Sequence, residues 1–135
     1  MATMLIVEDD PAWRALYLME FGQQFDVFEA NDGLQALSML DWVQPDVILL
    51  DLKLPKLDGK HFLEKLHDKG VRAPVVVCSG AILEGAAALQ GVQMAPKTGD
   101  LNHVRTAVRT AIRAAGVVSR GLEPETDRDE MPWRD

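Results

Sequence analysis

Residues 45–55 read Pro45-Asp46-Val47-Ile48-Leu49-Leu50-Asp51-Leu52-Lys53-Leu54-Pro55, and this stretch decides the fold of the chain. Its apolar run, Val47 to Leu50, has no polar alternation and is too short for an independent helix. It therefore predicts a strand that is buried on both faces. Because open α/β sheets bind ligands at the carboxyl ends of their strands, Asp51 stands where a nucleophile or a metal ligand would be useful.

Short apolar segments and amphipathic segments alternate along the rest of the chain. Further strands are expected at 3–7, 25–30, 74–78 and 92–95, and helices at 11–21, 34–42, 59–69, 82–90 and 101–115. The more polar segment 25–30 is expected at a sheet edge, and Leu34, Leu37 and Leu40 are expected to form the buried stripe of their helix. This order predicts an α/β fold in which a doubly wound, five-stranded parallel sheet carries helices on both faces.

The chain has 135 residues, which is enough for one domain with a buried core. The apolar periodicity continues to residue 115 and stops at Gly116. Residues 123–135 are rich in Asp, Glu, Pro and Arg. We therefore expect a domain over 1–115 and an acidic C-terminal tail over 116–135.

Bulk properties exclude several classes of function. A formal net charge of −7 argues against direct binding of nucleic acid, which needs clustered Lys and Arg. No apolar run approaches the length of a membrane span, and no basic stretch precedes an apolar block as in a signal peptide. The single cysteine, Cys78, suits a reducing compartment. We expect a cytoplasmic protein that does not contact a membrane.

Chemically useful side chains follow four of the five expected strands. These are Glu8 and Asp9, Asp51, Ser79, and Lys97. Carboxylates that share a pocket repel one another unless a cation joins them, and oxygen ligands with open positions suit Mg²⁺. A backbone carbonyl near Lys53 could complete the protein ligands. A metal, a hydroxyl and an ammonium around one aspartate fit phosphoryl transfer to Asp51.

The segments that carry these residues resemble the receiver domain of two-component response regulators. The segments are Leu5-Ile6-Val7-Glu8-Asp9-Asp10, Asp51 with Pro55 and Asp58-Gly59, Ser79-Gly80, and Lys97. The resemblance covers about residues 3–115. It implies a flavodoxin-like sheet with strand order 2-1-3-4-5.

The resemblance also implies a role for each matching residue. Asp51 would take a phosphoryl group from a histidine kinase or a phosphotransfer protein. Glu8 and Asp9 would hold Mg²⁺ together with Asp51 and the backbone carbonyl of Lys53. Ser79 would turn toward the phosphoryl group, and Lys97 would pair with it.

A stand-alone receiver of this kind would catalyse at most its own phosphorylation and dephosphorylation. Its output would come through contacts with an output protein that the sequence does not identify, or it would act as a phosphate sink for its kinase. The sequence leaves open whether the protein is a monomer or a homodimer.

The chain departs from the family pattern near the last expected strand. Pro96-Lys97-Thr98 stands where the family usually has Lys followed by Pro, and Met94 stands where it often has Tyr or Phe. An alternative function is therefore a receiver-like binding module that works without phosphorylation. An aspartate-dependent phosphatase is less favoured because Lys53 occupies the place of its second acid. A flavin carrier is less favoured because Glu8-Asp9-Asp10 would repel phosphate.

Overall fold

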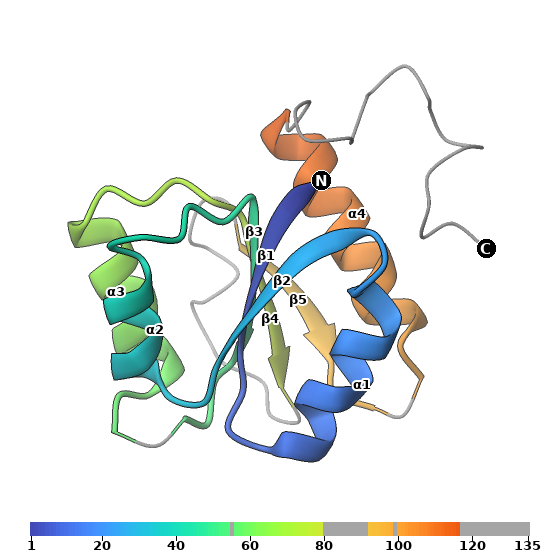
Figure 1. Ribbon diagram of the computed structural model, residues 1–135, viewed down its shortest axis with the longest axis horizontal. Helices are drawn as coiled ribbons and strands as arrows, with labels where there is room; N and C mark the ends of the chain where they lie inside the picture. The colour runs from blue at the N-terminus through green and yellow to red at the C-terminus, as the bar shows by residue number, and fades with distance from the viewer. Residues whose placement is uncertain (55, 80–91, 99, 117–135) are drawn as a thin grey trace.

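The computed structural model describes residues 1–54, 56–79, 92–98 and 100–116 (Figure 1). Strands and helices follow one another along these residues. In chain order they are β1 (Ala2–Val7), α1 (Pro11–Phe21), β2 (Phe25–Ala30), α2 (Gly33–Met39), β3 (Val47–Asp51), α3 (Gly59–Asp68), β4 (Val75–Ser79), β5 (Val92–Pro96) and α4 (Asn102–Ala115).

The five strands form one parallel sheet in the order β2-β1-β3-β4-β5. The expected α/β fold, its doubly wound sheet and its strand order are confirmed. β2 lies at an edge, as its polarity indicated. From β1 the chain moves to β2 at one edge of the sheet, whereas from β3 it continues through β4 to β5 at the other edge. Open α/β sheets bind ligands where the strand order reverses in this way, which here is at the carboxyl ends of β1 and β3.

Alternate side chains of the central strands point to opposite faces of the sheet, and each face has its own core. Met4, Ile6 and Leu49 pack with buried side chains of α1 and α4. Leu5 and Leu50 pack on the other face with α2 and α3. Figure 1 shows the two helix layers on either side of the sheet. Since successive strand residues face opposite sides, the central strands need apolar residues at every position.

Aspartate caps fix the start of three helices. The carboxylates of Asp10, Asp32 and Asp58 accept backbone N–H groups from Ala12, Gln35 and His61 at 2.8, 2.7 and 2.9 Å. Each cap satisfies an otherwise unpaired amide in the first helical turn. The Asp10 cap, followed by Pro11 at the first helical position, makes α1 begin directly beside the end of β1.

Some expected boundaries were wrong. The second helix ends at Met39 instead of Trp42, because the chain tightens there into turns such as Trp42 N–H to Met39 O at 3.0 Å. Leu34 is 53% exposed, and Ala36 and Met39 are buried in its place. The last helix begins at Asn102, although Asp100 still accepts the Asn102 N–H at 2.9 Å.

Two expectations lie outside the described residues. They are the helix at 82–90 and the acidic tail, of which the structure describes only Gly116. Within the described ranges, no helix has both the length and the apolar character needed to cross a bilayer.

The loop after β3 is held by a close approach at Gly59. The Gly59 N–H donates to Leu52 O at 2.9 Å. A Cβ added at Gly59 would lie 2.6 Å from Leu52 Cα and 3.1 Å from Asp51 O. We expect Gly59→Ala to lower the free energy of unfolding by about 1–3 kcal/mol, because overpacking forces the backbone to move.

Urea denaturation would measure this loss, with Lys60→Ala on the exposed side of the same helical turn as the control. Wild-type stability in Gly59→Ala would contradict the close packing of this loop.

Candidate functional site

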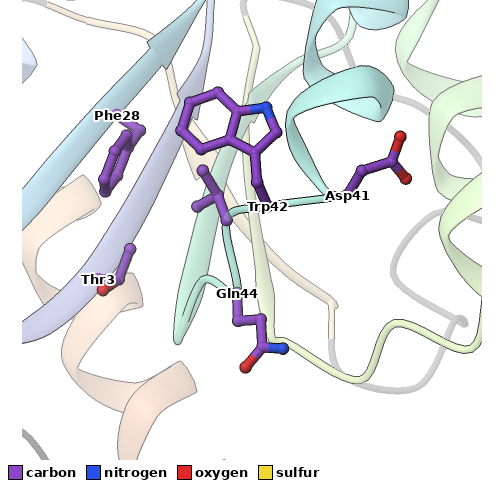
Figure 2. A pocket seen from close by; sticks show the side chains of 6 residues that line it. Thr3, Phe28, Asp41, Trp42 and Gln44 are labelled. Carbon is purple, nitrogen blue, oxygen red and sulfur yellow. The ribbon is translucent and has the colours of Figure 1, made fainter.

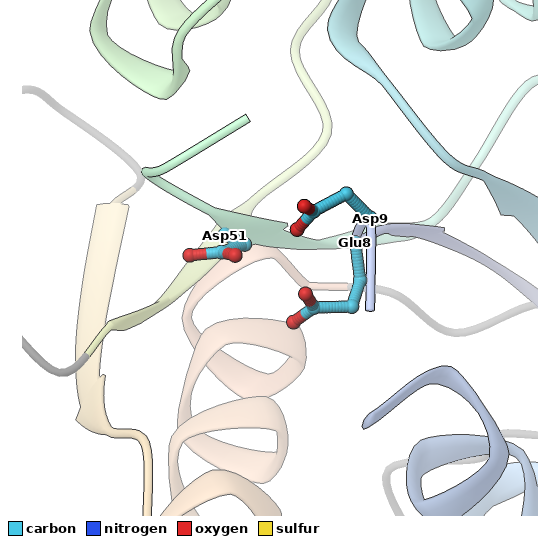
Figure 3. Close-up of side chains that lie close together, drawn as sticks. All are labelled: Glu8, Asp9 and Asp51. Atoms are coloured by element: carbon cyan, nitrogen blue, oxygen red, sulfur yellow. The ribbon is translucent and has the colours of Figure 1, made fainter. Parts of the chain in front are cut away.

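Three carboxylates meet at the carboxyl ends of β1 and β3. One oxygen atom from each of Glu8, Asp9 and Asp51 lies within 4.8 Å of the others. Figure 3 shows the three side chains gathered at the ends of the two strands. Glu8 is 1% exposed and Asp51 is 6% exposed, whereas Asp9 is open to solvent. The expected acid cluster is therefore present, with two of its members withdrawn from water.

Lys97 places a positive charge inside this cluster. It follows β5, and its Nζ lies 2.7 Å from Glu8 Oε1 and 3.1 Å from Asp51 Oδ2. Burial tends to lower the pKa of Lys97, but the hydrogen bonds and charges of Glu8 and Asp51 outweigh it, so the pKa is raised. Lys97 stays protonated and balances part of the negative charge.

Glu8 is the most constrained acid of the cluster. Its Oε2 accepts the Asp10 N–H at 3.1 Å, while its Oε1 faces Lys97. Loss of solvent through burial, together with the negative charge of Asp51, raises the pKa of Glu8 from 4.5 to about 7. Lys97 and the Asp10 amide oppose this rise without cancelling it. The ionised form of Glu8 therefore lacks enough positive charge around it.

Arg14 holds the loop that carries the two neighbouring acids. Its Nη1 donates to the backbone oxygens of Glu8 at 2.9 Å and Asp9 at 3.2 Å, and its Nε lies 3.5 Å from Glu29 Oε1. Arg14 was not among the site residues expected from the sequence. The signal that could have found it is an arginine in the first turns of a helix that starts directly after an acidic run.

Asp51 is oriented through both of its oxygens. Oδ1 accepts the Lys53 N–H at 3.2 Å, and Oδ2 accepts from Lys97. The exposed side chain of Lys53 follows in the loop after β3. This arrangement suits the expected backbone role of Lys53, and the carbonyl ligand itself stays a prediction.

Ser79 lies at the expected edge of the sheet. It ends β4 and pairs in register with Pro96, directly before Lys97, while Cys78 pairs with Asp51. Its side chain lies outside the described part of the structure. The backbone thus brings Ser79 to the neighbouring strand end, and its role stays a prediction.

The donor set suits a hard divalent cation. Glu8, Asp9 and Asp51 offer only oxygen atoms, and such ligands favour Mg²⁺, Ca²⁺ or Mn²⁺ over softer metals. A cation among them would offset the burial and the nearby charge of Asp51, which together raise the Glu8 pKa. The residues present therefore fit a metal ion of this class.

Known proteins resemble most of this chain. The family described as the response regulator receiver domain matches residues 4–109. Sporulation initiation phosphotransferase F of Bacillus subtilis is 30% identical over 111 residues, which cover 78% of this chain and 90% of that protein. Protein-glutamate methylesterase/protein-glutamine glutaminase 1 of Carboxydothermus hydrogenoformans is 35% identical over 106 residues. These cover 74% of this chain and only 31% of that protein.

Solved structures share the fold. The response regulator receiver domain protein from Clostridium thermocellum superposes with a TM-score of 0.75 at 20% identity and covers 86% of this chain and 98% of that one. The receiver domain of the Francisella response regulator 1452 gives a TM-score of 0.74 at 23% identity, over 84% and 98% of the two chains.

The raised pKa of Glu8 predicts a pH-dependent stability. The folded state keeps a proton up to about pH 7, whereas the unfolded chain releases it near 4.5. The contribution of this proton to stability is therefore full below pH 4.5 and is lost as the pH rises through 7. We expect Glu8→Gln, which cannot ionise, to gain stability relative to wild type between pH 5 and pH 8, by on the order of 2 kcal/mol.

Urea unfolding of both proteins at the two pH values, with EDTA present, measures this gain. Glu64→Gln removes a carboxylate from an exposed position on α3 and serves as the control. An equal stability difference between Glu8→Gln and wild type at both pH values would contradict the prediction.

Proposed function

Because the chain belongs to the response regulator receiver domain family, we propose that Asp51 accepts a phosphoryl group from a phosphohistidine. The donor would be a histidine kinase or a phosphotransfer protein. One observation carries the proposal: Asp51 is buried between two further acids and the ammonium of Lys97. A carboxylate oxygen of Asp51 attacks phosphorus while the bond from phosphorus to the histidine nitrogen breaks, which leaves an aspartyl phosphate and a free imidazole.

Each neighbouring residue has a proposed part in this transfer. Lys97, 3.1 Å from Asp51 Oδ2, pairs with an oxygen of the incoming phosphoryl group. The Lys53 N–H keeps the Asp51 carboxylate in one orientation. Ser79, at the end of the neighbouring strand, supplies a hydroxyl that turns toward the bound group.

We also propose that Glu8, Asp9 and Asp51 hold Mg²⁺, with the backbone carbonyl of Lys53 as a further ligand. The oxygen-only donor set and the raised pKa of Glu8 support this choice. When bound, Mg²⁺ would neutralise negative charge on the phosphoryl oxygens. Arg14 keeps the loop of Glu8 and Asp9 in place without using a carboxylate of the cluster.

The proposed output is a contact with another protein, or removal of phosphate from the kinase. The name of the Bacillus subtilis relative, a phosphotransferase, supports a place in a chain of phosphoryl transfers. Because this chain spans only 31% of the methylesterase relative, we do not propose an esterase activity for it. We propose that the protein catalyses nothing beyond its own phosphorylation and dephosphorylation. We also propose that residues 1–115 form the receiver domain and that residues 116–135 form an acidic tail.

A receiver-like module that binds its partner without phosphorylation is the second candidate. It is favoured by the half-exposed Met94 on β5 and by the order Pro96-Lys97-Thr98, which departs from the family pattern. The two functions differ in whether Asp51 becomes modified.

Phosphorylation of Asp51 can be tested with acetyl phosphate and Mg²⁺. We expect intact-mass spectrometry to find one added phosphoryl group on the wild type and none on Asp51→Asn, because the amide is not a nucleophile. Asp68→Asn, at the exposed end of α3, should be labelled like the wild type. An unlabelled wild-type protein would favour the binding module, and labelling of Asp51→Asn would move the acceptor to another residue.

Binding of Mg²⁺ should depend on the two acids that follow β1. We expect Glu8→Gln and Asp9→Asn each to weaken Mg²⁺ binding at least tenfold, or about 1.4 kcal/mol, because each removes a charged ligand. Isothermal titration calorimetry measures the affinity. Asp10→Asn is the matched control, since its side chain caps α1 and Asn caps helices equally well. A loss in Asp10→Asn as large as in the other two would point to net charge instead of ligation.

A further inference from the structure

Lys97 has a third neighbour besides the two carboxylates. Its Nζ lies 5.1 Å from the centre of the Trp13 ring, within the range of a cation–π interaction. The Lys97 side chain is only 15% exposed, so water competes weakly for the ammonium.

Trp13 is held by the same loop that carries the acids. Asp10 caps the helix three residues before it, and Arg14, the next residue, ties the helix to the backbone oxygens of Glu8 and Asp9. One turn further, the buried Tyr17 lies with its ring centre 5.8 Å from that of Trp13. Contacts between residues that are close in the sequence therefore fix the position of the indole ring relative to Glu8.

The other two partners of Lys97 are the groups that a cation would use. Glu8 Oε1 and Asp51 Oδ2 both belong to the acid cluster. A divalent ion bound there would draw these oxygens away from the ammonium and would repel it. The face of the Trp13 ring is the partner that no metal ion takes.

We propose that Trp13 is a positioning residue for Lys97. It keeps the ammonium beside Asp51 while the carboxylates are engaged by a divalent cation, so that Lys97 remains available to the phosphoryl group. This inference rests on the proposed function. It also gives a reason why Lys97 can be placed in the site by the unusual loop Pro96-Lys97-Thr98, since the ring constrains the side chain from the opposite element, α1.

Nuclear magnetic resonance of the Lys97 side chain tests the contact directly. The ε-methylene signal is assigned by its loss in Lys97→Met. In the wild type, we expect the ring current of Trp13 to shift this signal upfield, both in EDTA and in saturating Mg²⁺. Trp13→Phe should keep part of the shift, and Trp13→Leu should lose it. Trp42→Leu is the matched control, because this indole is 66% exposed and makes an edge-to-face contact with Phe28 instead of with Lys97 (Figure 2).

The same variants are then labelled with acetyl phosphate and Mg²⁺. We expect Trp13→Leu to slow labelling about fivefold, which corresponds to ~1 kcal/mol, with partial rescue in Trp13→Phe and an unchanged rate in Trp42→Leu. Circular dichroism confirms that each variant is folded.

Either readout can overturn the inference. An unchanged Lys97 signal in Trp13→Leu, or a wild-type signal that loses its shift when Mg²⁺ is added, excludes the positioning role. Equal slowing in Trp13→Phe and Trp13→Leu would indicate a purely structural role. Failure of the wild type to become labelled refutes the proposed phosphorylation, whereas the Lys97 signal in Mg²⁺ still decides the role of Trp13.

Discussion

The ammonium of Lys97 between the carboxylates of Glu8 and Asp51 is the interaction on which the site depends. At 2.7 and 3.1 Å, it is the charge that lets two buried acids remain close together. It is not sufficient, because the pKa of Glu8 is still raised to about 7. The negative charge of the cluster is therefore only partly compensated, and a divalent cation would compensate the rest.

The fold produces this juxtaposition through the alternation of its strands. Glu8 continues the set of β1 side chains that includes Met4 and Ile6, and Asp51 continues the set of β3 that includes Leu49. Both sets face α1 and α4. Because the strands are parallel, their carboxyl ends meet at one edge, and the charged residues lie where the apolar face runs out. A shift of one residue in the register of either strand would turn its carboxylate to the opposite face of the sheet.

The sequence allowed the sheet and the three acids of the cluster to be predicted, because both follow from where buried strands end. Leu34 shows where such reasoning fails: it has the spacing of a buried stripe and yet is exposed, because the buried face of this short helix runs through Gly33, Ala36 and Met39. The contact of Trp13 with Lys97 was beyond prediction for another reason. It joins elements more than 80 residues apart, and it depends on the exact position of α1 relative to the loop after β5.

The cluster also shows how stability and function oppose each other at one place. An apolar side chain at Glu8 would suit its burial, and the ionised carboxylate is disfavoured there near neutral pH. Several contacts nevertheless hold this loop in place: the Asp10 N–H donates to the Glu8 carboxylate, and Arg14 donates to the backbone oxygens of Glu8 and Asp9. Contacts that orient an acid without neutralising it fix the geometry and leave the charge available. Such an arrangement suits a site that must receive a cation more than one that only stabilises the fold.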